Sequence, residues 1–312
     1  MEQTVYDSLV QRLGRVHLRQ RLGLEKEYEA QVFRRGTHFF HLENWYLAHA
    51  VIRGSLGLVG LHGRGRRNAL RIRTVQNDIT LAGLPAAFDG YTLLHLSDLH
   101  LDMSADFVHA LIERVRALDY DLCVLTGDYR YRTRGPYQPA LDGLAQLRPH
   151  LKGKVYAVLG NHDTIRMVPG MEDLGIRVLL NESVRIERHG AAIHLAGIDD
   201  AHYYRVDNLH KAAHDIPHED ISILLSHTPE PYRNAAHADF RVMLCGHTHG
   251  GQICLPGGIP LITDCDCPRA FARGPWRYHD LVGYTSVGAG SSIVDVRLNC
   301  PPEITLHRLR RV

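Results

Sequence analysis

The segment at residues 92–100 reads TLLHLSDLH, an apolar run that ends in an aspartate and a histidine. Short apolar runs of this kind, bounded by polar residues, are typical of buried β-strands. Four further runs end in the same way at polar side chains, in residues 121–128, 154–163, 221–227 and 240–249. Loops that follow the carboxyl ends of strands in an open α/β sheet converge. The five segments therefore predict an α/β domain with a polar site at the ends of its strands.

The polar ends of these runs carry five short motifs of carboxylate, amide and imidazole side chains. They read Asp98-Leu99-His100, Gly127-Asp128, Gly160-Asn161-His162-Asp163, Ser226-His227 and Gly246-His247-Thr248-His249. Oxygen and imidazole ligands without thiolates suit a pair of divalent first-row ions better than a structural zinc ion. The chain has 22 histidines, so a single histidine carries little information. The ordered set of five motifs is what predicts a metal site.

The segments between the motifs predict alternating helices and strands. Ser104 is a suitable N-cap for a helix after the first motif. Its core face would consist of Phe107, Leu111, Val115 and Leu118 at helical spacing. Further strands are expected at residues 71–82, 192–197, 281–287 and 304–309. This alternation indicates layers of sheet flanked by helices, without fixing the number of sheets.

The five motifs resemble those of the calcineurin-like metallophosphoesterases, from about Ile72 to the C-terminus. The sequences GHTHGGQI at 246–253 and NCPPEI at 299–304 are similar to a bacterial branch of that family. Members of this branch are often made with an N-terminal membrane segment. The resemblance implies a four-layer αββα sandwich, here with a helical N-terminal extension. It also implies a hydrolase that acts on phosphoric ester or phosphoanhydride bonds.

The resemblance further implies a binuclear centre of manganese, iron or zinc, with manganese favoured. One ion would be bound by Asp98, His100 and His249, and the other by Asn161, His227 and His247. Asp128 would bridge the two, since a carboxylate has two oxygens to share. Two ions about 3.5–4 Å apart can lower the pKa of a bridging water and clamp an in-line displacement. The predicted reaction is hydrolysis of a phosphodiester or pyrophosphate bond by a metal-bridging hydroxide.

Two residues of the third motif have predicted catalytic roles instead of ligand roles. His162 would protonate the leaving oxygen or stabilise charge in the transition state, and Asp163 would orient or charge it. Substrate contacts are predicted for Arg130, Arg132 and Gln252. The two arginines lie in the basic, aromatic segment after Asp128 and suit phosphate recognition. The alternative is that this segment is a solvated charged loop.

Three competing functions differ in the features that they require. A UDP-2,3-diacylglucosamine pyrophosphatase of lipid A synthesis usually has arginine after the asparagine of the third motif, where this chain has His162. It also has glycine after the histidine of the fourth motif, where this chain has Thr228. A non-catalytic scaffold on the same fold would be expected to lose ligands, and all seven are present. Nucleic-acid binding is not expected, because no recognised motif accompanies the basic residues.

The N-terminal part of the chain differs in charge from the rest. Residues 1–73 carry a net charge of +7, whereas the remainder carries −5. We therefore expect an extension at 1–70 and a metallophosphoesterase domain at 71–312. Within the extension, residues 44–61 are apolar but are interrupted by Arg53 and glycines, which argues against a membrane span. The extension could contact an anionic membrane surface, or a lipid-linked substrate there, or it could pack on the domain.

The expected location is the cytoplasm, with peripheral contact at the inner face of the membrane. The first residues lack the apolar core and cleavage site of a secretory signal.

The six cysteines are expected to be reduced structural residues of a cytosolic protein. Cys265-Asp266-Cys267 lacks the paired two-residue spacing of a zinc site.

Overall fold

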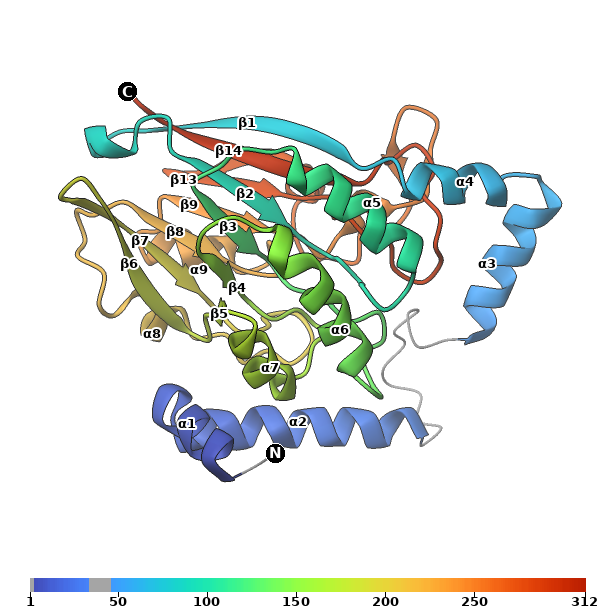
Figure 1. Cartoon of the computed structure of the whole chain (residues 1–312), viewed down its shortest axis with the longest axis horizontal. Helices are drawn as coiled ribbons and strands as arrows, with labels where there is room; N and C mark the ends of the chain where they lie inside the picture. Colours follow the sequence, from blue (N-terminus) through green and yellow to red (C-terminus); the bar gives the residue numbers. More distant parts are fainter. Residues whose placement is uncertain (1–2, 34–45) are drawn as a thin grey trace.

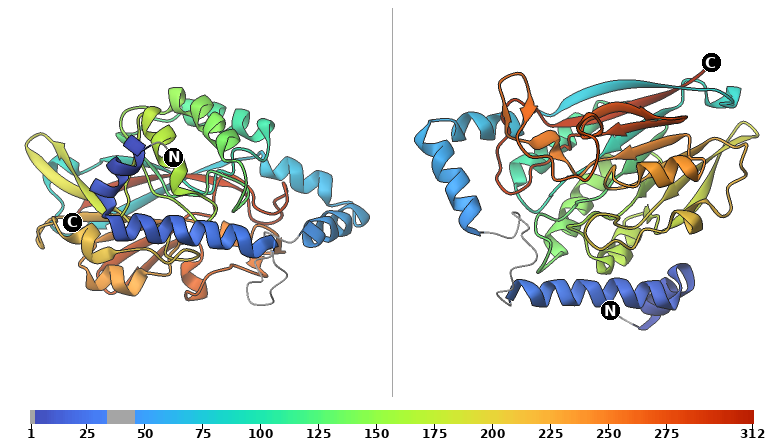
Figure 2. Two further views of the ribbon diagram at one scale, coloured as in Figure 1. Left: turned by 90° about the horizontal axis from the view of Figure 1, so that it is seen from below. Right: turned by 180° about the vertical axis from the view of Figure 1, so that it is seen from behind.

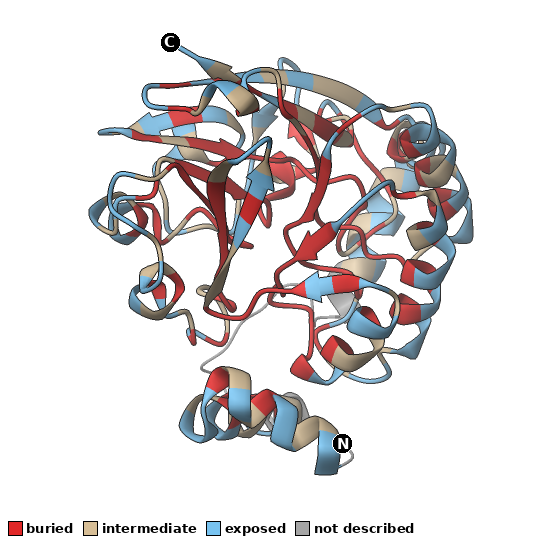
Figure 3. Ribbon diagram, turned by 60° about the vertical axis from the view of Figure 1, so that its left-hand side comes forward, coloured by how far each residue is buried: buried red, intermediate tan, exposed pale blue. Residues whose placement is uncertain are grey.

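Two six-stranded sheets pack face to face between layers of helices. The computed structural model describes residues 3–33 and 46–312 (Figure 1). The four-layer αββα sandwich predicted from the family resemblance is confirmed. Buried residues lie mainly along the strands and on the inner faces of the helices (Figure 3). One apolar cluster, which includes Leu93, Leu195 and Leu244, fills the space between the two sheets.

The first sheet has the strand order β1-β14-β2-β3-β4-β5. Its strands are β1 (Arg73–Leu81), β14 (Glu303–Arg311), β2 (Thr92–Leu96), β3 (Leu122–Leu125), β4 (Val155–Ala157) and β5 (Ile176–Val178). Strands β2 to β5 pair in parallel, whereas β14 runs antiparallel to β2. The carboxyl ends of β2, β3 and β4 therefore lie at one edge of this sheet.

The second sheet has the strand order β12-β13-β9-β8-β7-β6. Its strands are β12 (Gly274–Tyr278), β13 (Leu281–Thr285), β9 (Val242–Cys245), β8 (Ser222–Leu225), β7 (Ala191–Gly197) and β6 (Glu182–Arg188). The four central strands are parallel, and the two edge strands are antiparallel. A small hairpin of β10 (Cys254–Leu255) and β11 (Ile259–Pro260) lies outside both sheets.

Helices cover the outer face of each sheet. The first sheet is covered by α5 (Ala105–Arg116), α6 (Gln138–Leu147) and α7 (Val168–Asp173), and the second by α8 (Leu209–Ala213) and α9 (Tyr232–His237). As predicted, Ser104 caps α5, where its hydroxyl accepts a hydrogen bond from the backbone N–H of Phe107 at 3.4 Å. Phe107, Leu111 and Val115 are buried on the inner face of α5, and Leu118 is partly buried against the same cluster.

The N-terminal helices fall into two pairs. They are α1 (Gln3–Leu13), α2 (Arg15–Phe33), α3 (Tyr46–Leu58) and α4 (His62–Ala69). Leu9, Leu13 and Leu18 join the apolar cluster under the helices of the first sheet, so α1 and the start of α2 pack on the domain. Figure 2 shows α2 extended across the lower face of the molecule. Residues 34–43, also predicted to be helical, lie outside the described residues.

Neither pair of helices contains a membrane span. Among residues 3–33 and 46–312, no helix has both the length and the apolar composition needed to cross a bilayer.

The expectation that all six cysteines are reduced needs one correction. Four cysteines are buried free thiols, but Cys265 and Cys267 form a disulfide, because their loop brings the two Cα atoms within 5.4 Å.

Candidate active site

The five motifs meet at the carboxyl ends of strands from both sheets. Strands β2, β3 and β4 of the first sheet lead to the first three motifs, and β8 and β9 of the second sheet lead to the last two. All the predicted ligands are buried, with exposed fractions of 7% or less: Asp98, His100, Asp128, Asn161, His227, His247 and His249. The site therefore lies where the two sheets approach each other.

Five of these residues have backbone conformations that non-glycine residues rarely adopt. The φ angles are 53° at Asp98, 42° at His100, 59° at Asp128, 73° at His247 and 48° at His249. Strained conformations of this kind persist only where the surrounding structure imposes them, and they gather at functional sites. Here they turn each side chain back from its strand end toward a common centre.

Glycines in the motifs let the loops approach one another closely. At Gly160, an added Cβ would overlap a carboxylate oxygen of Asp128. At Gly246, it would overlap Ser97 Oγ and the carboxylate of Asp98. Only the absence of a side chain at these two positions allows the ligands of neighbouring loops to share one small volume.

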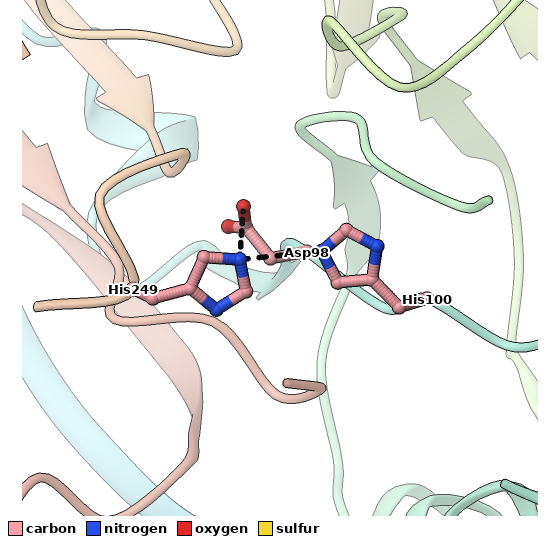
Figure 4. Close-up of side chains that lie close together, drawn as sticks. All are labelled: Asp98, His100 and His249. Atoms are coloured by element: carbon pink, nitrogen blue, oxygen red, sulfur yellow. Dashed lines mark hydrogen bonds and ion pairs between the residues drawn. The ribbon is translucent and has the colours of Figure 1, made fainter. Parts of the chain in front are cut away.

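The first group of predicted ligands consists of Asp98, His100 and His249, which point toward one another (Figure 4). The Nε2 atoms of the two histidines are 3.2 Å apart, and His249 Nε2 lies 3.5 Å from Asp98 Oδ1. His100 Nδ1 donates to the carbonyl oxygen of Arg130 at 2.8 Å. That bond leaves the lone pair of His100 Nε2 facing the group, as metal-binding histidines require.

The second group consists of Asn161, His227 and His247. Asn161 Oδ1 is 2.9 Å from His227 Nε2 and 3.0 Å from His247 Nδ1. The opposite ring nitrogens donate to backbone carbonyls, His227 Nδ1 to Thr126 at 2.7 Å and His247 Nε2 to Asp264 at 2.7 Å. Each ring therefore turns its other nitrogen toward the amide oxygen of Asn161.

Asp128 lies between the two groups. Its Oδ2 atom is 3.8 Å from His100 Nε2 in the first group and 3.3 Å from His227 Nε2 in the second. The other oxygen, Oδ1, accepts a hydrogen bond from the backbone N–H of His162 at 3.0 Å. One carboxylate thus faces both groups.

The charges at the site are those that a cation would balance. Burial raises the pKa of Asp98 to about 6, and the nearby charge on Asp128 acts in the same direction. Asp163 is raised to a pKa of about 6 for the same two reasons. Burial also opposes ionisation of Asp128, but His227 and His162 hold its pKa well below its usual range. Crowded buried carboxylates, oxygen and nitrogen donors, and imidazoles fixed by carbonyls all fit divalent metal ions.

His162 and Asp163 lie beside the ligands but act on different groups. His162 Nδ1 is hydrogen-bonded to the carbonyl oxygen of Tyr131 at 2.6 Å, and its Nε2 is 3.8 Å from Asp128 Oδ2. The carboxylate of Asp163 accepts from the backbone N–H groups of Asp128 at 2.8 Å and Gly160 at 2.9 Å. The bonds of Asp163 therefore fix the loop backbone, and the carbonyl of Tyr131 orients the ring that Asp163 was predicted to orient.

Two of the residues predicted to contact substrate have other partners. Arg130 is 2% exposed and donates from Nε to the carbonyl oxygen of His162 at 2.8 Å. Gln252 is also buried, and its amide binds the backbone of Ser292 through both its oxygen and its nitrogen. These bonds hold loops together, because both side chains turn toward backbone groups. Arg132 is exposed, as a substrate contact requires.

Two buried cations beside the site were missed by reasoning from sequence. Arg297 is fully buried, with Nη2 3.2 Å from His249 Nδ1 and 2.8 Å from the carbonyl oxygen of Val287. Arg21 of α2 is also fully buried and donates to the carbonyl oxygen of Asp163 at 3.0 Å. Arg21 is 142 residues from Asp163 and Arg297 is 48 residues from His249, so no local sequence pattern indicates these two contacts.

Comparison with known proteins decides the family. Residues 91–251 match the family described as calcineurin-like phosphoesterase. The chain belongs to this family. Metallophosphoesterases normally bind divalent metal ions, and the His and Asp groups described above are candidates for that centre. The protein is therefore a hydrolase of phosphoric ester bonds.

Curated relatives of this metallophosphoesterase come from bacteria and animals. The Bacillus subtilis protein named uncharacterized metallophosphoesterase YkoQ is 32% identical over 237 residues, 73% of this chain and 86% of that protein. Phosphodiesterase YaeI of Escherichia coli is 27% identical, over 70% of this chain and 82% of its own length. The Danio rerio protein named transmembrane protein with metallophosphoesterase domain is 30% identical over 75% of this chain, but only 56% of that relative is covered.

Proposed function

We propose that this metallophosphoesterase hydrolyses a phosphodiester or pyrophosphate bond with two divalent ions. The observation that carries the proposal is the position of Asp128 between two adjoining groups of ligands. Asp98, His100 and His249 would hold one ion, and Asn161, His227 and His247 the other, with Asp128 shared. Bound ions would supply an activated water and neutralise charge on the phosphate.

His162 is the proposed proton donor to the leaving oxygen. Its ring is held by the carbonyl of Tyr131 at Nδ1, so Nε2 is the atom that faces the ligands. A protonated ring could give that proton to the leaving group while the bond to phosphorus breaks. His162 is only 2% exposed, which limits competition from bulk water.

The non-phosphate part of the substrate has a candidate binding site beside the first group. A shallow surface pocket reaches His100 and is bounded by α4 and α5. Its apolar lining includes Leu70, Met103 and Phe107, and Arg66 and Asp295 lie at its polar side. This mixture favours a phosphodiester or pyrophosphate with an apolar substituent, including a lipid-linked one. The name of the E. coli relative supports the diester.

A metal and substrate panel tests the proposed function. Protein stripped with chelator is reloaded with manganese, iron or zinc, and each form is assayed on mono-, di- and pyrophosphate substrates. We expect two ions per chain by elemental analysis, and turnover of diesters or pyrophosphates that chelator abolishes. Saturation at one ion per chain, or activity that survives complete removal of metal, would contradict the two-metal mechanism.

We also propose that α3 and α4 form a membrane-facing surface at the inner face of the membrane. The predicted boundary between the N-terminal extension (residues 1–70) and the domain (residues 71–312) places α3 and α4 in the extension and β1 in the domain. Leu58 is 91% exposed and Val59 is 66% exposed, although both are apolar. Exposed arginines lie beside them, at Arg53 and Arg64 among others. Apolar insertion together with attraction of about 1 kcal/mol per basic residue would favour an anionic bilayer.

Vesicle sedimentation tests this surface. We expect the protein to sediment with anionic vesicles at low salt and to be released as salt rises, because screening weakens the attraction. A variant with Arg53→Gln, Arg64→Gln and Leu58→Asn should stay in the supernatant while keeping wild-type activity on a soluble substrate. Equal recovery of wild type in the supernatant with anionic and neutral vesicles would show that the surface has another role.

A further inference from the structure

Helix α2 contacts the loop that carries three of the candidate active-site residues, Asn161, His162 and Asp163. Glu25 accepts hydrogen bonds from Thr164 Oγ1 at 2.6 Å and from the backbone N–H of Ile165 at 2.7 Å. Arg21, one turn earlier on the same face, donates from Nη2 to the carbonyl oxygen of Asp163 at 3.0 Å. Two side chains of α2 thus bind three consecutive residues of the loop after β4.

These contacts lie in the protein interior and not at its surface. Arg21 is 0% exposed and Glu25 is 5% exposed. Within the described part of the chain, Nε and Nη1 of Arg21 lack a hydrogen-bond partner, although Nε lies 3.6 Å from a carboxylate oxygen of Glu25. Burying a charge that is incompletely hydrogen-bonded carries a desolvation penalty. A well-packed apolar residue at this position would stabilise the fold at least equally. The buried arginine therefore points to a role in holding the loop geometry instead of a role in stability.

The same arginine also contacts the second sheet. Arg21 stacks on the ring of Tyr204, 3.4 Å from its centroid, and its Nε is 3.6 Å from Asp199 Oδ2. Asp199 also pairs with His17 of α2 at 3.2 Å. Asp199 and Tyr204 lie in the loop after β7, whereas the Asp163 loop follows β4. Helix α2 therefore joins loops that belong to different sheets.

That connection matters because the second group of ligands also spans both sheets. Asn161 comes from the loop after β4, and His227 and His247 come from the second sheet, with Asn161 Oδ1 only 2.9 Å and 3.0 Å from the two rings. A small displacement of the β4 loop would separate the amide from the imidazoles. It would also move His162, which follows Asn161 directly.

We propose that Arg21 and Glu25 are positioning residues, which hold the β4 loop so that Asn161 can bind metal and His162 can reach the substrate. The inference rests on the proposed function of the site. Residues that orient metal ligands typically contribute about 10–100-fold to metal affinity or activity. Helix α2 would then contribute to the geometry of the active site.

The test removes the contacts from each side. In Arg21→Met or Glu25→Ala, kcat should fall about 10–100-fold and the second ion should bind more weakly, with a smaller change in the first. Glu25→Gln should restore most activity, because its amide can still accept from Ile165 and donate to Thr164. Thr164→Val removes the contact with Glu25 without altering α2, together with the hydrogen bond that Thr164 Oγ1 accepts from the N–H of Arg166, and should also lower kcat. Thr164→Ser keeps both contacts and should rescue kcat.

Hydrogen exchange provides a readout that does not depend on turnover. The N–H of Ile165 should exchange faster in Glu25→Ala, because its acceptor is lost, while amides of the central strands keep their protection. Arg19→Met and Glu27→Ala are matched controls, since they make the same chemical changes at exposed positions of α2. Both should behave as wild type.

Two results would overturn the inference. One is wild-type kcat and metal stoichiometry in folded Arg21→Met and Glu25→Ala. The other is a lower melting temperature with unchanged turnover per folded molecule, which would make the contacts merely structural. Failure of the wild-type protein to bind two ions would instead reject the proposed function, so the two failures are distinguishable.

Discussion

Asp128→Asn should remove most metal binding and most activity. The substitution keeps an oxygen that can accept from the N–H of His162, but it removes the charge that faces both groups of ligands. Each ion would lose a ligand, and the loss of several kcal/mol of charge stabilisation corresponds to about 10³-fold in turnover. Elemental analysis after dialysis and steady-state kinetics at fixed manganese measure the two effects.

A surface carboxylate provides the control for this experiment. Asp142 is exposed on α6, where it accepts a hydrogen bond from Gln138. Asp142→Asn makes the same chemical change away from the site and should leave metal content and kcat unchanged. If Asp128→Asn kept two ions and full turnover, Asp128 could not be the bridging ligand.

His162→Ala should keep both ions and lower turnover by roughly 10²–10⁴-fold, the usual contribution of a general acid or base. The reason is that its ring lies beside the ligands while its Nδ1 is bound to Tyr131. The loss should shrink for substrates with very acidic leaving groups, such as nitrophenols, because these leave without protonation. A plot of log kcat against leaving-group pKa, for wild type and variant, measures this difference.

A second variant separates proton transfer from positioning. In His162→Gln, the side-chain amide can still donate to the carbonyl of Tyr131, but it cannot act as an acid. We expect the turnover of His162→Gln to be as low as that of His162→Ala on substrates with poor leaving groups. Recovery of wild-type turnover by Gln would assign His162 a positioning role, and loss of metal in either variant would make it a ligand.

Much of the fold was predictable because its signals are local. The apolar runs before Asp98, Asp128 and Asn161 became β2, β3 and β4, and Ser104 capped α5. Strand formation at these runs needs only buried, β-branched-rich segments, and the position of a motif at a strand end follows from its place in the chain. The number of sheets came from family resemblance, since periodicity does not report how layers stack.

The roles of several polar residues could not be predicted in the same way. Arg130 and Gln252 were expected to face the substrate, yet each turns to backbone groups inside the protein. An arginine beside a metal motif has the same sequence signal whether it binds phosphate or a carbonyl. The direction of the side chain depends on which carbonyls the neighbouring loops bring near, and that is a property of the packed structure.

The residues alone predict five of the strands, the candidate metal ligands that follow them, and thereby the family. The directions of the predicted ligands depend on the folded chain, in which Asp98 and Asp128 have left-handed backbone. The folded chain also brings α2 onto the loop after β4, through contacts such as that of Glu25 with Thr164, 139 residues away. Secondary-structure propensity depends on neighbouring residues and can be inferred from short segments. Contacts over such long separations form only when the whole chain is packed.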